Sequence, residues 1–122
     1  RVGLALSDPL GIGATPLAVV ARSDAVVEIA RVVEERDVET IVIGLPTSLG
    51  GEEGKSAADA RKLGEQLAEL TQVSVVFHDE RFTSRMAESA LLESGMKRRK
   101  RRDTVDKVAA AIILRDYLDT RR

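Results

Sequence analysis

The sequence predicts an α/β fold in which a mixed sheet is flanked by helices. Residues 1–7 and 15–22 read as two short apolar strands joined by a Gly-rich turn, a pattern typical of an antiparallel hairpin. Residues 40–46 and 73–80 are continuous apolar runs of strand length, which are typical of parallel strands. Segments whose apolar residues have helical spacing lie between and after these runs. This alternation of strands and helices predicts a layered α/β domain.

Composition narrows the class of protein. A chain of 122 residues is long enough for one domain, and the absence of Cys excludes disulfides and cysteine-based catalysis. No apolar run is long enough to span a membrane and no signal peptide opens the chain, so we expect a cytoplasmic protein. The net charge of −1 includes six consecutive cations at residues 97–102, so the other residues sum to −7. Any affinity for polyanions should therefore be local.

The first half of the chain holds the predicted hairpin and one βα unit. Asp8-Pro9 marks the turn between the first two strands. Ser23 is expected to cap a helix with an apolar face. Gly44 and Pro46, at the end of the strand over residues 40–46, indicate a place where another group approaches closely. The apolar face of the helix consists of Val26, Ile29, Ala30 and Val33.

A Gly-rich loop over residues 47–55 leads into the second half. Its Gly54-Lys55-Ser56 ending suggests a phosphate-binding P-loop, but Leu49 occupies the position where that motif requires Gly. Ser56 is instead expected to cap a helix, followed by the strand over residues 73–80, a helix over 83–94 that ends at Gly95, and a last helix over about 103–119. The apolar face of the first of these helices is predicted to be Ala60, Leu63, Leu67 and Leu70.

Asp106 is an unexpected acid in the apolar last helix. At roughly 100° per residue it lies on the side of Ile113 and Tyr117, and nearly opposite Arg115, so it should face the sheet. A buried lone carboxylate is unfavourable unless a cation or hydrogen-bond donors meet it. Two readings remain open: a helix cap with Asp103 at the N-cap and Asp106 at N3, or a divalent-cation site shared with other carboxylates.

The segment His78-Asp79-Glu80-Arg81 ends a predicted parallel strand, where α/β proteins place functional groups. Asp79 and Glu80 should point to opposite faces, so only one of them can join a given site, and Arg81 could pair with the other. The simpler interpretation is that the segment is an exposed group of charged residues without a functional role. His78 is more typical of a partly buried, hydrogen-bonded residue than of a catalytic base.

The basic run could be a solvated surface segment or a contact for a phosphate backbone. It has no interleaved aromatic residues, so base stacking is not expected and binding would not read sequence. The residues predicted to bind nucleic acid are Lys97, Arg98, Arg99, Lys100, Arg101 and Arg102.

Four segments together resemble one family over nearly the whole chain. They are "RVGLALSDPLGIGATPLAVV", "IVIGLP" with "GGEEGKSAADA", "FHDERFTSRMAESAL", and "VDKVAAAIILRDYL". They resemble the YqgF-type Holliday-junction resolvases, also called RuvX-like and described as pre-16S rRNA nucleases. The resemblance implies an RNase H-like fold and a Mg²⁺- or Mn²⁺-dependent endonuclease that processes the 5′ end of precursor 16S rRNA in ribosome biogenesis.

The resemblance also implies roles for particular residues. Glu80 and Asp106 match the family's acidic catalytic and metal-binding positions, with Asp79, Arg81 and Thr83 in supporting positions. In the family, a central first strand with the leading catalytic Asp precedes the strand that corresponds to residues 1–7. We therefore expect residues 1–122 to form a single RNase H-like nuclease domain that is N-terminally incomplete.

Other functions stay open from the sequence. A non-catalytic RNA-binding or ribosome-assembly factor, or a resolvase of branched DNA, would also use the basic run. A nucleotide-binding ATPase would share the sheet topology, but the chain has no convincing phosphate loop.

Overall fold

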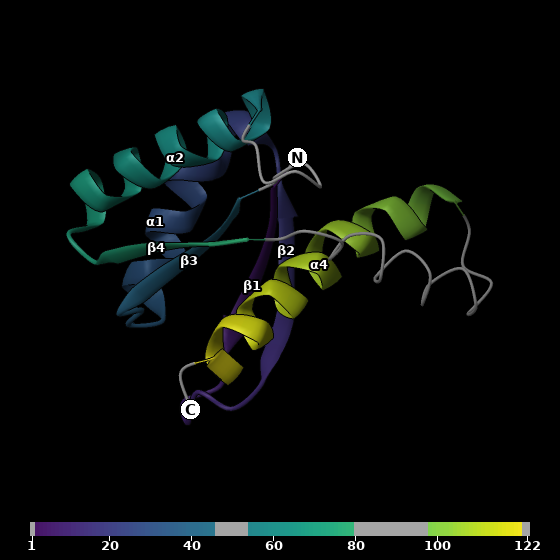
Figure 1. Ribbon diagram of the computed structural model, residues 1–122, viewed down its shortest axis with the longest axis horizontal. Helices are drawn as coiled ribbons and strands as arrows, with labels where there is room; N and C mark the ends of the chain where they lie inside the picture. The colour runs from purple at the N-terminus through teal and green to yellow at the C-terminus, as the bar shows by residue number, and fades with distance from the viewer. Residues whose placement is uncertain (1, 46–53, 80–97, 121–122) are drawn as a thin grey trace. The chain divides into compact units, whose positions relative to one another are not determined.

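The computed structural model describes residues 2–45, 54–79 and 98–120 (Figure 1). The chain divides into two compact units, and each is described by itself. The first unit contains β1 (Val2–Ser7), β2 (Ala14–Val20) and α4 (Arg98–Thr120). The second contains the 3-10 turn η1 (Arg22–Asp24), α1 (Ala25–Glu35), β3 (Thr40–Leu45), α2 (Lys55–Thr71) and β4 (Ser74–Asp79). The mixture of helices with antiparallel and parallel strands confirms the predicted α/β class.

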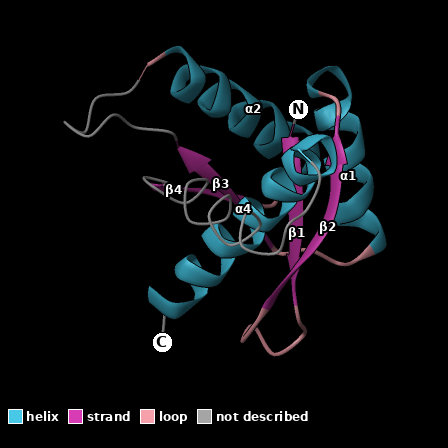
Figure 2. Ribbon diagram, turned by 90° about the vertical axis from the view of Figure 1, so that its right-hand side faces the viewer, coloured by secondary structure: helices cyan, strands magenta, loops and turns pink. Residues whose placement is uncertain are grey.

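In the first unit, β1 and β2 form the predicted antiparallel hairpin (Figure 2). The register shifts after Leu4: Leu4 pairs with Ala18 whereas Ala5 pairs with Pro16, which leaves Leu17 as an extra residue in β2. Pro16 has no N–H to donate to the ladder, and a bulge is one of the few places where a strand accommodates proline.

The turn of this hairpin is organised by Asp8, as predicted. Its carboxylate accepts hydrogen bonds from the backbone N–H groups of Ile12 and Gly13, both at 2.9 Å. The backbone N–H of Gly11 donates to the carbonyl of Asp8 at 3.0 Å, and Gly11 has a φ of 68°, which favours glycine. The hydrogen bonds from Ile12 and then Gly13 hold the pKa of Asp8 below its ordinary value of 3.8.

The contribution of Asp8 to stability should therefore depend on pH. Because the folded hairpin lowers this pKa, the contribution is complete above pH 3.8 and is lost as the pH falls through the lowered folded value. We expect the free energy of unfolding of the parent to exceed that of Asp8→Asn near neutral pH, and the difference to narrow in acid. Urea denaturation of both proteins from neutral to acid pH measures this difference in the free energy of unfolding. A difference that stayed constant in acid would contradict a stabilising role for the ionised Asp8 carboxylate.

Helix α4 begins at Arg98, five residues earlier than predicted. Asp103 therefore lies inside the helix, and of the two open readings the helix cap with Asp103 at the N-cap is wrong. Arg and Lys are good helix formers, which favours a helix through the basic run even though cations near a helix N-terminus oppose the helix dipole. The helix packs along both β1 and β2 (Figure 1), and within its residues 106–120 the buried ones are Ala109, Ala111 and Ile113.

In the second unit, α1 presents the predicted apolar face. Ala25 is buried, and the four residues named from the sequence are half-buried. The predicted cap is wrong, because Ser23 lies in η1 and Asp24 occupies the N-cap position without a capping side-chain hydrogen bond. The 3-10 turn lengthens the entry into the helix and moves its start past Ser23.

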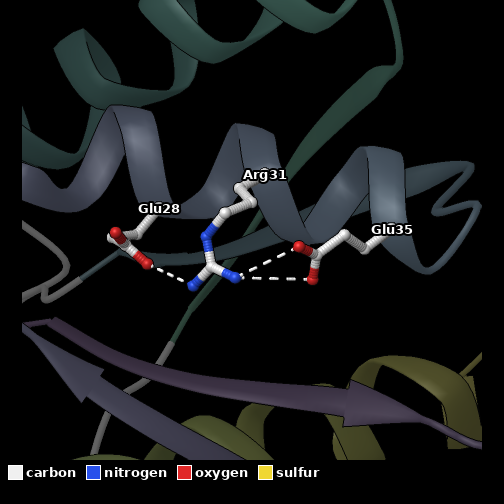
Figure 3. A network of polar contacts seen from close by, with 3 residues as sticks. All are labelled: Glu28, Arg31 and Glu35. Carbon is white, nitrogen blue, oxygen red and sulfur yellow. Dashed lines mark hydrogen bonds and ion pairs between the residues drawn. The ribbon is translucent and has the colours of Figure 1, made fainter.

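The opposite side of α1 carries a network of charges (Figure 3). The guanidinium of Arg31 lies 2.5 Å from a carboxylate oxygen of Glu28 and 3.2 Å from one of Glu35. The hydrogen bond to Glu28, followed by that to Glu35, raises the pKa of Arg31 above its ordinary value. All three side chains are substantially exposed, so water and salt screen the network and the apolar face holds α1 in place.

Strands β3 and β4 pair in parallel, as predicted, from Thr40 with Ser74 to Leu45 with Asp79. Helix α2 connects them along the chain and packs against both strands and against α1. The loop over residues 46–53 and the predicted helix over residues 83–94 with Gly95 lie outside the described residues.

The apolar face of α2 differs from the predicted one. Leu67 is fully buried and Leu63 is half-buried, but Leu70 is 58 % exposed. Ala57 and Gly64 are buried instead, and at about 100° per residue they lie on the other side of Leu67 from Leu70. The buried face of α2 therefore includes small residues and excludes Leu70. A prediction based on large apolar residues cannot identify such a face. The predicted cap at Ser56 is also wrong, since the helix begins at Lys55 after Gly54.

Candidate functional site

Asp106 lies where the helical spacing predicted. It is half-buried, and its backbone carbonyl abuts Gly3 of β1, so it is on the side of α4 that packs against this strand. Arg115, predicted to lie opposite, is exposed. The first unit therefore places one carboxylate at the boundary between a helix and a strand, where its backbone is fixed by packing.

Asp79 is the last residue of β4 and pairs with Leu45, the last residue of β3. It is exposed, whereas the preceding residue, His78, is half-buried beside Gly44. The second unit therefore places Asp79 at the carboxyl edge of a parallel pair of strands, which is where functional groups gather in α/β proteins.

Two residues of α2 hold β4 immediately before this edge. A Cβ atom on Gly64 would lie 2.6 Å from Cζ of Phe77, so the phenyl ring packs directly on the helix backbone. The guanidinium carbon of Arg61 lies 5.2 Å from the centroid of the same ring, a cation–π distance. Phe77 directly precedes His78 and Asp79, so these contacts anchor the end of the strand that carries the acid.

Other predicted site residues, Glu80, Arg81, Thr83 and Lys97, lie outside the described residues. The backbone of residues 98–102 forms the first turns of α4. Within the described ranges, no three or more His, Cys, Asp or Glu residues are grouped so that they could hold a metal ion. The meeting of Glu80 with Asp106 remains a prediction.

The sequence reasoning missed Gly3 and Gly64. Glycine inside a strand signals a close approach of another backbone, and Gly3 carried that signal within the first apolar run. Gly64 gave a weaker signal, because an isolated glycine in a helical pattern is tolerated for several reasons.

Comparison with known proteins places this α/β chain among nucleic-acid-processing enzymes: the family model described as "RuvX: Holliday junction resolvase" matches residues 1–120. The chain belongs to this RuvX family. A relative from Anaeromyxobacter sp. (strain Fw109-5) is 44% identical over 124 residues, covering 99% of this chain and 90% of the relative. A relative from Chloroflexus aggregans is 42% identical over 125 residues, covering 100% and 88%.

A third relative, from Clostridium botulinum (strain Alaska E43 / Type E3), is 40% identical over 121 residues, covering 97% of this chain and 88% of the relative. Each of the three is named "Putative pre-16S rRNA nuclease". Among the helices that the structure describes, none combines the length and hydropathy needed to cross a membrane.

Proposed function

We propose that the chain is a divalent-metal-dependent endonuclease that hydrolyses phosphodiester bonds in structured nucleic acid, with the 5′ region of precursor 16S rRNA as its substrate. The observation that carries the proposal is that α4 contains both a cationic run and an acid packed near β1. One continuous helix begins with five cationic residues, at 98–102, and continues to the half-buried Asp106 against β1. A rigid element thus joins a candidate phosphate contact to a candidate catalytic acid.

The charge arrangement of α4 supports binding of a polyanion. Its first turn contains no acidic residue, and consecutive cations at the positive end of the helix dipole are unfavourable because they oppose the dipole and repel one another. A nucleic-acid backbone would relieve both repulsions and release its own counterions. The contact would position the substrate without reading its sequence.

The acidic residues of the proposed site are of a type that binds Mg²⁺ or Mn²⁺. Asp79 and Asp106, the described acids among the predicted site residues, offer hard carboxylate oxygens, which these ions prefer. We propose Glu80 and Asp106 as the residues that hold the cation. When bound, the cation would activate water and neutralise charge that develops on the scissile phosphate.

The other residues of the proposed site have supporting tasks. Asp106 would hold its carboxylate in one place because its backbone is packed on β1. Asp79 would add negative charge at the strand edge, while Arg81 and Thr83 would orient the neighbouring acid or a phosphate oxygen by donating hydrogen bonds. The cations of residues 97–102 would hold the substrate backbone.

The names of the relatives support precursor 16S rRNA as the substrate. A role in ribosome biogenesis in the cytoplasm is part of the same proposal. The description of the family model favours a second candidate, a four-way DNA junction. The two substrates share the phosphodiester bond and the need for a basic contact.

Cleavage of matched substrates tests the proposal. The full-length protein is incubated with a labelled precursor 16S rRNA fragment or with a four-way DNA junction, in Mg²⁺, in Mn²⁺, or in chelator. We expect the RNA to be cut at a defined 5′ position only when a divalent cation is present. Cutting of the junction alone would favour the resolvase, and tight RNA binding without any cutting would favour a non-catalytic assembly factor.

A variant in which residues 97–102 are replaced by neutral residues, compared with the parent in the same assay, tests the role of the basic run. We expect weaker RNA binding and a flatter dependence of affinity on salt, because fewer counterions are released, while cutting at saturating RNA persists. An unchanged salt dependence would show that the basic run does not contact the phosphate backbone.

A further inference from the structure

We infer that Gly3 is a positioning residue for Asp106, and that the absence of a side chain at position 3 sets where the Asp106 carboxylate stands. This inference rests on the proposed function, because it assigns Gly3 a task only if Asp106 binds the cation. The residue belongs to β1 and has no reactive group of its own.

The contact between Gly3 and α4 is made by backbone atoms. A Cβ atom on Gly3 would lie 2.0 Å from the carbonyl oxygen of Asp106, 2.4 Å from its carbonyl carbon and 2.9 Å from the nitrogen of Lys107. Real Cβ atoms essentially never approach a non-bonded heavy atom within 3.0 Å. The helix backbone would therefore have to retreat by about 1 Å or more, since no flexible side chain can give way instead.

The strand cannot easily yield either. Gly3 pairs with Val19 of β2 within the antiparallel ladder, so a movement of β1 would break backbone hydrogen bonds. Side chains alternate along a strand, so Ala5 and Ser7 share the face of Gly3, and both are small. Small side chains on this face of β1 favour close packing of α4, and Gly3 makes the backbone contact at Asp106.

A fixed peptide group between Asp106 and Lys107 fixes the direction of the Asp106 side chain. The carboxylate then reaches one region through a few staggered rotamers. Cations such as Mg²⁺ require near-ideal ligand geometry, and a misplacement of about 1 Å can reduce a rate by about 10²-fold. Gly3 thus contributes to the proposed metal site by setting the distance between the backbones of β1 and α4, and not by binding the cation.

The variant Gly3→Ala tests this inference. We expect kcat for RNA cleavage to fall about 100-fold with little change in KM, because the basic run still binds the substrate. Calorimetric titration with Mn²⁺ alone, without nucleic acid, should show an affinity about 10- to 100-fold weaker, the usual range for residues that orient a ligand. A folded Gly3→Ala protein with the parent's kcat and Mn²⁺ affinity would overturn the inference.

Gly11→Ala is the matched control. It makes the same change in the same hairpin, at a residue whose φ of 68° strains alanine, but nothing lies within 4 Å of the added Cβ. We expect lower stability with unchanged kcat and Mn²⁺ affinity. Equal losses of Mn²⁺ affinity in both variants would show that general destabilisation causes the effect and would overturn the role of Gly3.

A measurement on the unaltered chain serves if Gly3→Ala does not fold. Titration with Mg²⁺, followed by NMR, should shift the resonances of Gly3 and Asp106 with one shared affinity, and Asp106→Asn should abolish both shifts. Shifts at Asp106 with none at Gly3 would overturn the inference while leaving the proposed function intact. Unaltered cleavage by Asp106→Asn would instead overturn the proposed function.

Discussion

Asp106→Asn should abolish metal-dependent cleavage of the precursor RNA, reducing the rate by about 10³-fold or more. Replacing a carboxylate with a neutral amide of the same shape removes the ligand charge but keeps the packing of α4 on β1. A metal-held charge contributes several kcal/mol to the transition state, and each 1.36 kcal/mol is a factor of ten in rate. The rate of cleavage at saturating RNA and Mg²⁺ measures the effect.

The stability of Asp106→Asn should equal or exceed that of the parent in the absence of metal. Carboxylates that converge on a cation repel one another when the cation is absent, so removing one charge relieves the repulsion. Asp116→Asn, at an exposed position of the same helix, is the matched control and should leave cleavage unchanged. Equal rates for Asp106→Asn and the parent would refute the metal site.

Leu67→Ala should lower the free energy of unfolding by about 2–5 kcal/mol. Leu67 is the largest fully buried side chain of the described residues, with an exposed fraction of 0%. Its truncation removes buried apolar surface and leaves a cavity where α2 packs on β3, β4 and α1. Urea denaturation of the parent and the variant measures the change.

Leu70→Ala is the control on the same helix. Leu70 is 58 % exposed, so we expect a change within about 0.5 kcal/mol, as for most surface positions. The pair separates the face seen in the structure from the face predicted by spacing, which placed both leucines in the core. Equal losses for the two variants would restore the predicted face.

Local patterns predicted most of the fold. The antiparallel hairpin follows from strand alternation and the Asp8-Pro9 turn, and the parallel pair follows from two continuous apolar runs. Besides the face of α2, the errors lie at helix ends: the predicted caps Ser23 and Ser56 do not occupy N-cap positions, and the reading of Asp103 as a cap is excluded. A capping side chain is only one way to begin a helix, and here a 3-10 turn, a glycine and a run of good helix formers supplied the starts.

The sequence by itself determined the strand pairing types, the sheet-facing side of Asp106, and the family to which the chain belongs. These depend on periodicity and on motifs, which are properties of neighbouring residues. Tertiary structure decided which small residues lie at close contacts: Gly3 against the backbone of Asp106, and Gly64 against Phe77. Such contacts join segments far apart in the chain, and the distance between two packed backbones has no local signature beyond the missing side chain.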